Sequence, residues 1–444
     1  MPLLDDVNAG PDDGSHPDPA EAWSFETKQI HVGYAPEAGD ARALPIYQTT
    51  SYAFESTEHA RALFSLEEPG NVYSRIMNPT QDAIEQRIAA LEGGVAALLL
   101  SSGQAAVATA VLNLATAGDH IVTSPRLYGG SYTLFQHTLP RFGITVSFVE
   151  DPDDLEQWRA AVRPNTKAFF GESISNPRND VFDVEGVASV AHEHGIPLLI
   201  DNTVATPYLL QPLRHGADIV VHSATKYLGG HGTAIAGVLV DGGTFDWASG
   251  RFANFTTPDP SYHGLVYAEL GPPAYAIKAR VSLLRDLGAT LSPFSAFLLG
   301  QGIETLSLRV ERHVQNATAV AEFLAEHPGV ESVAYARLPS SAWYERGVRL
   351  APRGVGAVVA FEIAGGEKAA TTFIDALTLH SHVANIGDVR SLVLHPATTS
   401  HAQLSTEEQL TAGVTPATVR LSVGLESIDD ILADLRAGFT AVEQ

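Results

Sequence analysis

One lysine stands in the stretch of the chain that offers the most chemistry. Residues 218–232 read Asp-Ile-Val-Val-His-Ser-Ala-Thr-Lys-Tyr-Leu-Gly-Gly-His-Gly, so Lys226 follows an apolar run and comes after two hydroxyl side chains, Ser223 and Thr225. An amine at such a place is either a solvated ammonium or a nucleophile that forms a Schiff base with a carbonyl group. The chain has five lysines against a much larger number of arginines, which favours a chemical role for Lys226.

Further polar groups recur at regular intervals before Lys226. Each group directly follows a short apolar run, and the five groups are Ser101–Gln104, Arg126–Gly130, Glu172–Pro177, Asp201–Thr203 and Ser223–Lys226. Single groups of this kind are often plain turns or helix caps. Five in succession predict a ligand site, because in open α/β sheets ligands bind beyond the carboxyl ends of the strands.

The elements that must position these groups alternate between strands and helices. Expected strands are Val95–Leu100, His120–Thr123, Thr145–Val149, Lys167–Gly171, Pro197–Ile200 and Ile219–His222. Expected helices are Gln81–Glu92, Gln104–Ala115, Leu155–Ala161 and Val184–His194, the last ended by Gly195. This spacing predicts right-handed crossovers and a mostly parallel sheet that is covered on both faces.

The five groups suit a cofactor with a phosphate, an aldehyde and a pyridine ring. A phosphate is bound by backbone N–H groups at a helix N-terminus, here those of Gly103 and Gln104, and by hydroxyls such as those of Ser223 and Thr225. Competing cofactors fit less well, because the chain has no dinucleotide fingerprint and no phosphate loop of the Gly-Lys-Ser type. The scattered histidines show no paired ligand spacing, so no metal is expected.

The ring of such a cofactor needs its own partners. A carboxylate keeps a pyridine nitrogen protonated so that the ring can withdraw electrons, and Asp201 stands at the right strand end. Tyr128 can stack on the ring, Asn176 can hold the ring hydroxyl, and Lys226 can bind the aldehyde and move protons.

Composition limits the class of protein. The 444 residues carry a formal net charge of −24, which excludes the basic footprint of a nucleic-acid-binding protein. Cysteine is absent, so disulfides, thiolate metal sites and cysteine nucleophiles are excluded. The N-terminus is acidic and proline-rich, unlike a secretory signal, which makes the cytoplasm the expected compartment. The uncharged stretch Gly93–Gly118 is predicted to be a buried strand, turn and helix, with no membrane span.

The length predicts more than one domain. We expect a disordered acidic tail (1–22), a loop-rich arm without a core of its own (23–79), a large domain (80–273) and a smaller α+β domain (274–444). In the large domain, Phe255–Gly264 is predicted to be an ordered loop. In the smaller domain, we expect an amphipathic helix from Ile303 toward Pro328 and strands at Ala357–Ile363 and Val419–Val423. Ser427 and Asp430 are predicted to cap the last helix.

The motifs together resemble the Cys/Met-metabolism family of pyridoxal-phosphate (PLP) enzymes of fold type I. The resemblance runs from about Phe25 to the end and is carried by the stretch around Lys226, Asp201-Asn-Thr, Tyr73-Ser-Arg75 and Ser101–Ala106. It implies Lys226 as the Schiff-base lysine and Asp201 as the partner of the ring nitrogen. It also implies that Tyr128 stacks on the ring and shuttles protons, and that Gly103, Gln104, Ser223 and Thr225 hold the phosphate.

The same resemblance assigns residues to the substrate and to a neighbouring subunit. Arg420 matches the arginine that grips the substrate carboxylate, with Ser391 beside it. Tyr73 and Arg75 match residues sent across a dimer interface to the neighbour's phosphate, and Tyr73 also contacts substrate there. A homo-oligomer is therefore expected, a tetramer built from dimers that share active sites.

Within the family, the chain is similar to the subgroup that acts on O-acetyl-L-homoserine and sulfide. The runs Lys278–Asp286 and Asn385–His401 carry this similarity, although Gln104 replaces a common methionine and Thr398-Thr-Ser400 departs from the usual Ser-Thr-Thr. The implied reaction is γ-replacement to homocysteine and acetate. Cysteine as nucleophile, as in cystathionine γ-synthases, or water, as in γ-lyases, remain alternatives. A non-catalytic binding protein is disfavoured because Lys226, Asp201, Tyr128 and Arg420 are all present.

Overall fold

The computed structural model describes residues 22–402, 405–411 and 413–444. Its central feature is a seven-stranded sheet with the strand order β1-β7-β6-β5-β4-β2-β3. The strands are β1 (Ala96–Leu100), β2 (His120–Thr123), β3 (Thr145–Phe148), β4 (Thr166–Glu172), β5 (Leu198–Asp201), β6 (Ile219–His222) and β7 (Gly237–Asp241). Pairing from β3 through β6 is parallel, so the predicted mostly parallel sheet is confirmed.

Strand β7 was not predicted. It pairs antiparallel with both β1 and β6, inside the sheet. The alternation of strand and helix identifies parallel strands joined by crossover helices, whereas β7 returns from β6 through the loop that contains Lys226. All five residues of β7 are buried, as a strand inside a covered sheet requires.

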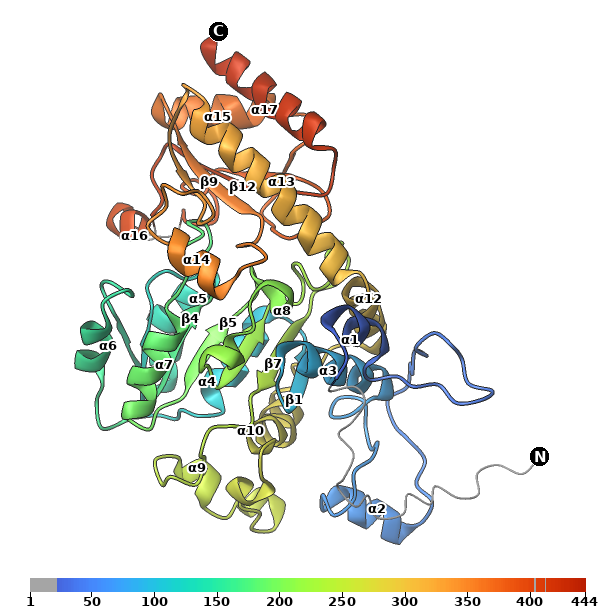
Figure 1. The fold of residues 1–444 in the computed structure, drawn as a ribbon. Coiled ribbons are helices and arrows are strands. Elements are labelled where there is room, and N and C mark those ends of the chain that lie inside the picture. Colours follow the sequence, from blue (N-terminus) through green and yellow to red (C-terminus); the bar gives the residue numbers. More distant parts are fainter. Residues whose placement is uncertain (1–21, 403–404, 412) are drawn as a thin grey trace.

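Helices cover both faces of this sheet (Figure 1). Alternate residues of β4 point to opposite layers: Ala168 and Phe170 pack in the cluster around α4, and Phe169 packs in the cluster around α6 and α7. The helices up to residue 303 are α1 (Phe25–His31), α2 (Thr57–Phe64), α3 (Pro79–Glu92), α4 (Gly103–Leu112), α5 (Gly129–Thr133), α6 (Leu155–Ala161), α7 (Val184–Glu193), α8 (Thr206–Leu209), α9 (Ala253–Thr256), α10 (Ala274–Lys278), α11 (Arg285–Leu287) and α12 (Pro293–Ile303).

Short 3-10 and π turns complete this part of the chain. A π-helical turn at Leu134–Thr138 follows α5, and a second one, Ala279–Leu284, joins α10 to α11. The 3-10 turns are Leu139–Phe142, Pro212–His215, Pro260–Tyr262 and Tyr267–Leu270. The predicted ordered loop Phe255–Gly264 thus contains the end of α9 and one of these turns.

A smaller mixed sheet forms the upper part of the molecule in Figure 1, with the order β10-β11-β12-β9-β8. Its strands are β8 (Val330–Ala334), β9 (Val358–Ile363), β10 (Ser381–His382), β11 (Leu392–Leu394) and β12 (Thr418–Ser422). Its helices are α13 (Leu306–Glu326), α14 (Tyr344–Leu350), α15 (Gly366–Ala376), α16 (Thr406–Thr411) and α17 (Ile428–Glu443). The expected fold class, an α/β large domain with a smaller α+β domain, is confirmed.

Two details of this part differ from expectation. The amphipathic helix is α13, which begins at Leu306 because a break at residues 304–305 separates it from α12. The predicted capping pair of the last helix is wrong: Ser427 stands at the N-cap of α17, but its side chain makes no capping hydrogen bond, and only its carbonyl accepts the N–H of Asp430, at 3.1 Å.

Domain limits are only partly visible in the packing. Residues Ala274, Tyr275 and Leu284 lie in the core on the α4 face of the larger sheet, although they fall in the segment expected to begin the smaller domain. The division at residues 273 and 274 stays a prediction. The expected tail falls outside the described residues, apart from residue 22. Among the described residues, no helix is both long and apolar enough to cross a membrane.

The arm that carries Tyr73 and Arg75 lies largely apart from the body of the chain. Helix α1 packs against α3 and α13, whereas α2 sits on a long excursion away from both sheets (Figure 1). Large apolar side chains on this excursion are exposed, among them Tyr47 (44%) and Phe64 (64%). The absence of a local core agrees with the loop-rich composition of residues 23–79.

Candidate active site

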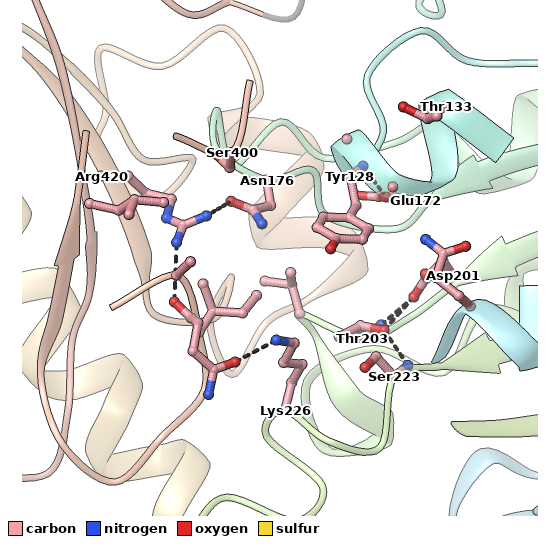
Figure 2. Close-up of a pocket in the computed structure, with 18 of the residues that line it drawn as sticks. Tyr128, Thr133, Glu172, Asn176, Asp201, Thr203, Ser223, Lys226, Ser400 and Arg420 are labelled. Atoms are coloured by element: carbon pink, nitrogen blue, oxygen red, sulfur yellow. Dashed lines mark hydrogen bonds between the residues drawn. The ribbon is translucent and has the colours of Figure 1, made fainter. Parts of the chain in front are cut away.

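A cavity of about 570 Å³ lies between the carboxyl ends of the parallel strands and the smaller domain. All five predicted polar groups contribute to the cavity, through Gln104 at the start of α4, Tyr128, Asn176, Asp201 and Lys226. The smaller domain closes the cavity with Arg420 from β12 and with Asn385 and Ser400 (Figure 2). The structure therefore brings together the predicted rim and the predicted substrate arginine.

Lys226 reaches into this cavity from the loop after β6 (Figure 2). Its ammonium donates a hydrogen bond to the side-chain oxygen of Asn385, and none of the described carboxylates forms an ion pair with it. Burial, together with the positive charge of Arg420, lowers the pKa of Lys226 to about 8. At pH 7 about a tenth of the amine is then neutral, far more than for an exposed lysine, and the neutral amine is the form that a nucleophile requires.

Arg420 is a buried cation that no carboxylate of the described chain neutralises. Its residue is 5% exposed, and its guanidinium donates to Asn176 Oδ1 at 3.4 Å and to the carbonyl of Asn385 at 3.1 Å. Its Nε has no hydrogen-bond partner among the described residues. Burial lowers the pKa of Arg420 to about 10. An unpaired, buried guanidinium fork at a cavity wall is suited to bind a carboxylate.

Asp201 lies on the other side of the cavity at the end of β5. Its Oδ1 accepts hydrogen bonds from the backbone N–H and the hydroxyl of Thr203, at 3.0 and 2.5 Å. Burial raises the pKa of Asp201, while the Thr203 hydrogen bonds and His222 oppose that rise. Thr203 Oγ1 also accepts the N–H of Ser223 at 2.7 Å, which ties the end of β5 to the loop that carries Lys226.

Tyr128 stands over the cavity between these charged groups (Figure 2). The ring is half-exposed, and the backbone N–H of Tyr128 donates to Glu172 Oε1 at 2.5 Å. Asn176 faces the same space and accepts from Arg420. An exposed ring held through its backbone can stack on a planar ligand without losing its anchor.

The N-terminus of α4 forms one end of the site. Gly103 opens this helix so close to Ser223 that a Cβ on Gly103 would lie 2.5 Å from that of Ser223. Only glycine permits this approach. The first N–H groups of a helix have no partner within it, so Gly103 and Gln104 present donors where Gln104 and Ser223 line the cavity.

Five predicted site residues do not line the cavity: Gly103, whose helix end is described above, Thr225, Ser391, Tyr73 and Arg75. The hydroxyl of Thr225 exchanges hydrogen bonds with the backbone of Ala236, at 3.0 and 3.1 Å. Ser391 is buried in the smaller domain and donates to Glu426 at 2.9 Å. Tyr73 and Arg75 lie on the arm, where the guanidinium stacks on the ring at 5.2 Å.

Three residues of the site were missed: Glu172, Thr203 and Asn385 all line the cavity. Glu172 and Thr203 stand in loops that had been selected, and their position directly after a strand was an available signal. Asn385 gave no such signal in the sequence, because it contacts Lys226 only through the packing of the smaller domain against the larger one.

Known proteins are similar in sequence to this chain along nearly its whole length. The family described as Cys/Met metabolism PLP-dependent enzyme matches residues 26–440. The chain belongs to this family. It is 58% identical over 429 residues to an O-acetyl-L-homoserine sulfhydrylase of Corynebacterium glutamicum, covering 95% of this chain and 98% of that protein.

Solved structures of family members are also similar. A protein from Campylobacter jejuni described as an O-acetylhomoserine (thiol)-lyase, solved with N'-pyridoxyl-lysine-5'-monophosphate, gives a TM-score of 0.92 at 43% identity and covers 95% of this chain and 100% of that one. A cystathionine γ-lyase of Lactobacillus plantarum, complexed with L-serine, gives 0.82 at 33% identity, with 95% and 100% covered. The predicted family and its cofactor, PLP, are confirmed.

The residues of this PLP enzyme fit the cofactor in each of its parts. Lys226 offers an amine of lowered pKa to the aldehyde. Asp201 is a partly buried carboxylate that forms no ion pair within the described chain, which suits a protonated ring nitrogen. The close approach of Gly103 to Ser223 forms the donor-rich end that a phosphate needs.

Proposed function

We propose that the protein catalyses a γ-replacement in which O-acetyl-L-homoserine and sulfide give L-homocysteine and acetate. The C–O bond at Cγ breaks with release of acetate, and a C–S bond forms at the same carbon. One observation carries the proposal: in a chain 58% identical to a sulfhydrylase, Arg420 stands unpaired in the cavity of Lys226, where it can hold the carboxylate of an amino acid.

The chain's own residues then have separable roles. PLP, when bound, supplies the aldehyde that captures the substrate amine and a ring that withdraws electrons from Cα. Arg420 binds the α-carboxylate, and the side chain of Asn176 connects this arginine to the ring region. Lys226, once free, takes the proton from Cα, and Tyr128 stands on the same cavity as a second group able to carry protons.

The walls of the cavity support a small nucleophile. Their apolar part is formed by Leu134, Ile174, Val204, Ala384, Ile386 and Leu394. Apolar walls keep a short-lived electrophile away from water. This favours sulfide over water as the attacking group.

Product analysis tests the proposal directly. Purified protein loaded with PLP is given O-acetyl-L-homoserine in three parallel reactions: with sulfide, with cysteine, and without a thiol. Homocysteine from the first reaction is expected as the dominant product. Cystathionine from the second in larger amount would establish the synthase alternative, and 2-oxobutyrate without a thiol would establish the lyase.

We propose further that the protein is a homo-oligomer, a tetramer built from dimers, in which Tyr73 and Arg75 complete the neighbour's site. Support comes from the arm: neither residue lines its own cavity, and Tyr73 is 40% exposed beside other exposed apolar side chains. Large exposed apolar patches mark interaction surfaces. Arg75→Ala and Lys226→Ala proteins, each inactive, should regain activity when mixed and reassembled. No regain, in assemblies shown by light scattering to be mixed, would reject shared sites.

A further inference from the structure

Glu172 has a place in the site that the reaction as described does not use. It ends β4 directly beside Asp201, its register partner on β5. The residue is 6% exposed and lines the cavity together with Asp201. Its carboxyl accepts the backbone N–H of Tyr128 at 2.5 Å and that of Asn176. One side chain therefore fixes the loops that present the stacking ring and the amide.

The charges around Glu172 leave it without a counterion. A second, small cavity on its other side is lined by Arg126, Asp153 and Asp180. Arg126 already contacts three carboxylates, those of Asp153 at 2.9 Å, Asp151 at 3.3 Å and Asp180 at 3.3 Å. Arg178 and Arg346 are likewise paired, with Asp180 and Asp153. Among the described residues, no cation forms an ion pair with Glu172.

Two adjacent buried carboxylates cannot both be ionised at low cost. Burial, and next the charge of Asp201, raise the pKa of Glu172 well above its usual range. Each carboxyl accepts two hydrogen bonds, but Asp201 also lies close to His222, so the anion is better held on Asp201. Lys226 enters the cavity from the loop after β6 and Arg420 from β12 of the smaller domain, and neither forms an ion pair with Glu172.

We infer that Glu172 is a positioning residue that stays protonated in the PLP-loaded enzyme, so that it holds Tyr128 in place while Asp201 remains the only anion beside the ring. In this state the carboxyl still accepts the N–H groups of Tyr128 and Asn176, and the proton occupies a carboxyl lone pair that these bonds leave free. The inference rests on the proposed function only through PLP binding, because it concerns the enzyme before any substrate arrives.

Glutamine is the matched replacement, since its amide keeps an acceptor oxygen and adds a permanent donor in place of the O–H. Glu172→Gln is expected to bind PLP with a Kd within about threefold of the wild-type value, because the hydrogen bond to Tyr128 survives. Glu172→Ala leaves two backbone N–H groups unpaired and is expected to weaken PLP binding about tenfold or more.

Infrared difference spectroscopy of the PLP-loaded proteins identifies the proton itself. Wild type minus Glu172→Gln, at neutral pH, should show the carbonyl band of a protonated carboxyl, shifted in D2O. Glu85→Gln is the matched control: Glu85 is also buried and also accepts a backbone N–H, that of Leu99, at 2.7 Å, but it pairs with Arg280. Its difference spectrum should show an ionised carboxylate, and its PLP affinity should stay unchanged.

An ionised-carboxylate band in the Glu172→Gln difference, or PLP binding as weak as in Glu172→Ala, would overturn the inference. Thermal unfolding of the PLP-free proteins shows that each variant is folded before binding is compared. All these readouts are taken without O-acetyl-L-homoserine or sulfide. A wrong assignment of the reaction therefore leaves them unaffected.

Discussion

Two buried lysines, Lys226 and Lys278, have the same lowered pKa and different surroundings. Burial lowers the pKa of each to about 8. Lys226 opens on a cavity of about 570 Å³ and faces Arg420. Lys278, on α10, is enclosed: it donates to the backbone and side-chain oxygens of Asn113, at 2.9 and 3.1 Å, and lies 5.0 Å from the ring of Phe255.

The two lysines show that a lowered pKa and access for a ligand are separate properties of a site. Desolvation alone makes a lysine amine easier to deprotonate, and both sites achieve it. Lys278 donates its hydrogen bonds to Asn113 and thereby joins α10 to the end of α4, so its role is structural. Only Lys226 combines a lowered pKa with space for a carbonyl compound and with a neighbouring site for a carboxylate. A perturbed pKa is thus a guide to function only together with a cavity.

The largest expected effect is the loss of activity in Lys226→Ala. Removal of the proposed covalent nucleophile and proton carrier should lower kcat/KM by roughly a thousandfold or more. Lys278→Met is the matched variant, and it should keep kcat/KM within about threefold while unfolding at lower stability, by about 1–3 kcal/mol, because the oxygens of Asn113 lose their donor. Steady-state kinetics and urea unfolding measure both. An equal loss of activity in the two variants would remove the distinction between the lysines.

Arg420→Lys tests the second feature that Lys278 lacks. A lysine keeps the charge but loses the two-pronged geometry that binds a carboxylate. The expected result is a rise in KM for O-acetyl-L-homoserine of at least about tenfold, with a smaller change in kcat. Arg312→Lys is the control, because Arg312 is an exposed residue of α13 that does not line the cavity. An unchanged KM would assign the carboxylate to another group.

Sequence reasoning found this site where local rules apply. Strands β2, β4 and β6 were predicted within about one residue because short apolar runs end at polar groups, and those groups form the rim. Gly103 and Asp201 followed from the same rule. Strand β7 was missed because it runs antiparallel to β6, so no crossover helix precedes it in the sequence.

The rest of the site depends on contacts between segments distant in sequence. Asn385 meets Lys226 across 159 positions, and Arg420 could be assigned only by family resemblance. The role of Glu172 could not be predicted, because it depends on whether a cation pairs with its carboxyl. Arg126, which lies near it, pairs with Asp153 instead. The phosphate role of Thr225 stays a prediction: hydroxyls near a lysine look alike in sequence, and in the structure the Thr225 hydroxyl bonds to the backbone of Ala236.

The smallest effect concerns pH and stability, and it isolates Lys278. Its pKa falls from the ordinary 10.5 to about 8 on folding, so between these values the unfolded state binds more protons than the folded state. Stability should therefore rise with pH across this range. In PLP-free protein Lys226 contributes in the same direction, and Lys278→Met should reduce the slope of unfolding free energy by up to about 1.4 kcal/mol per pH unit. Lys368→Met, at an exposed lysine, should keep the wild-type slope. Equal slopes in the wild type, Lys278→Met and Lys368→Met would mean that folding does not desolvate the ammonium of Lys278. Lys278 and Lys226 would then not share a pKa lowered by burial.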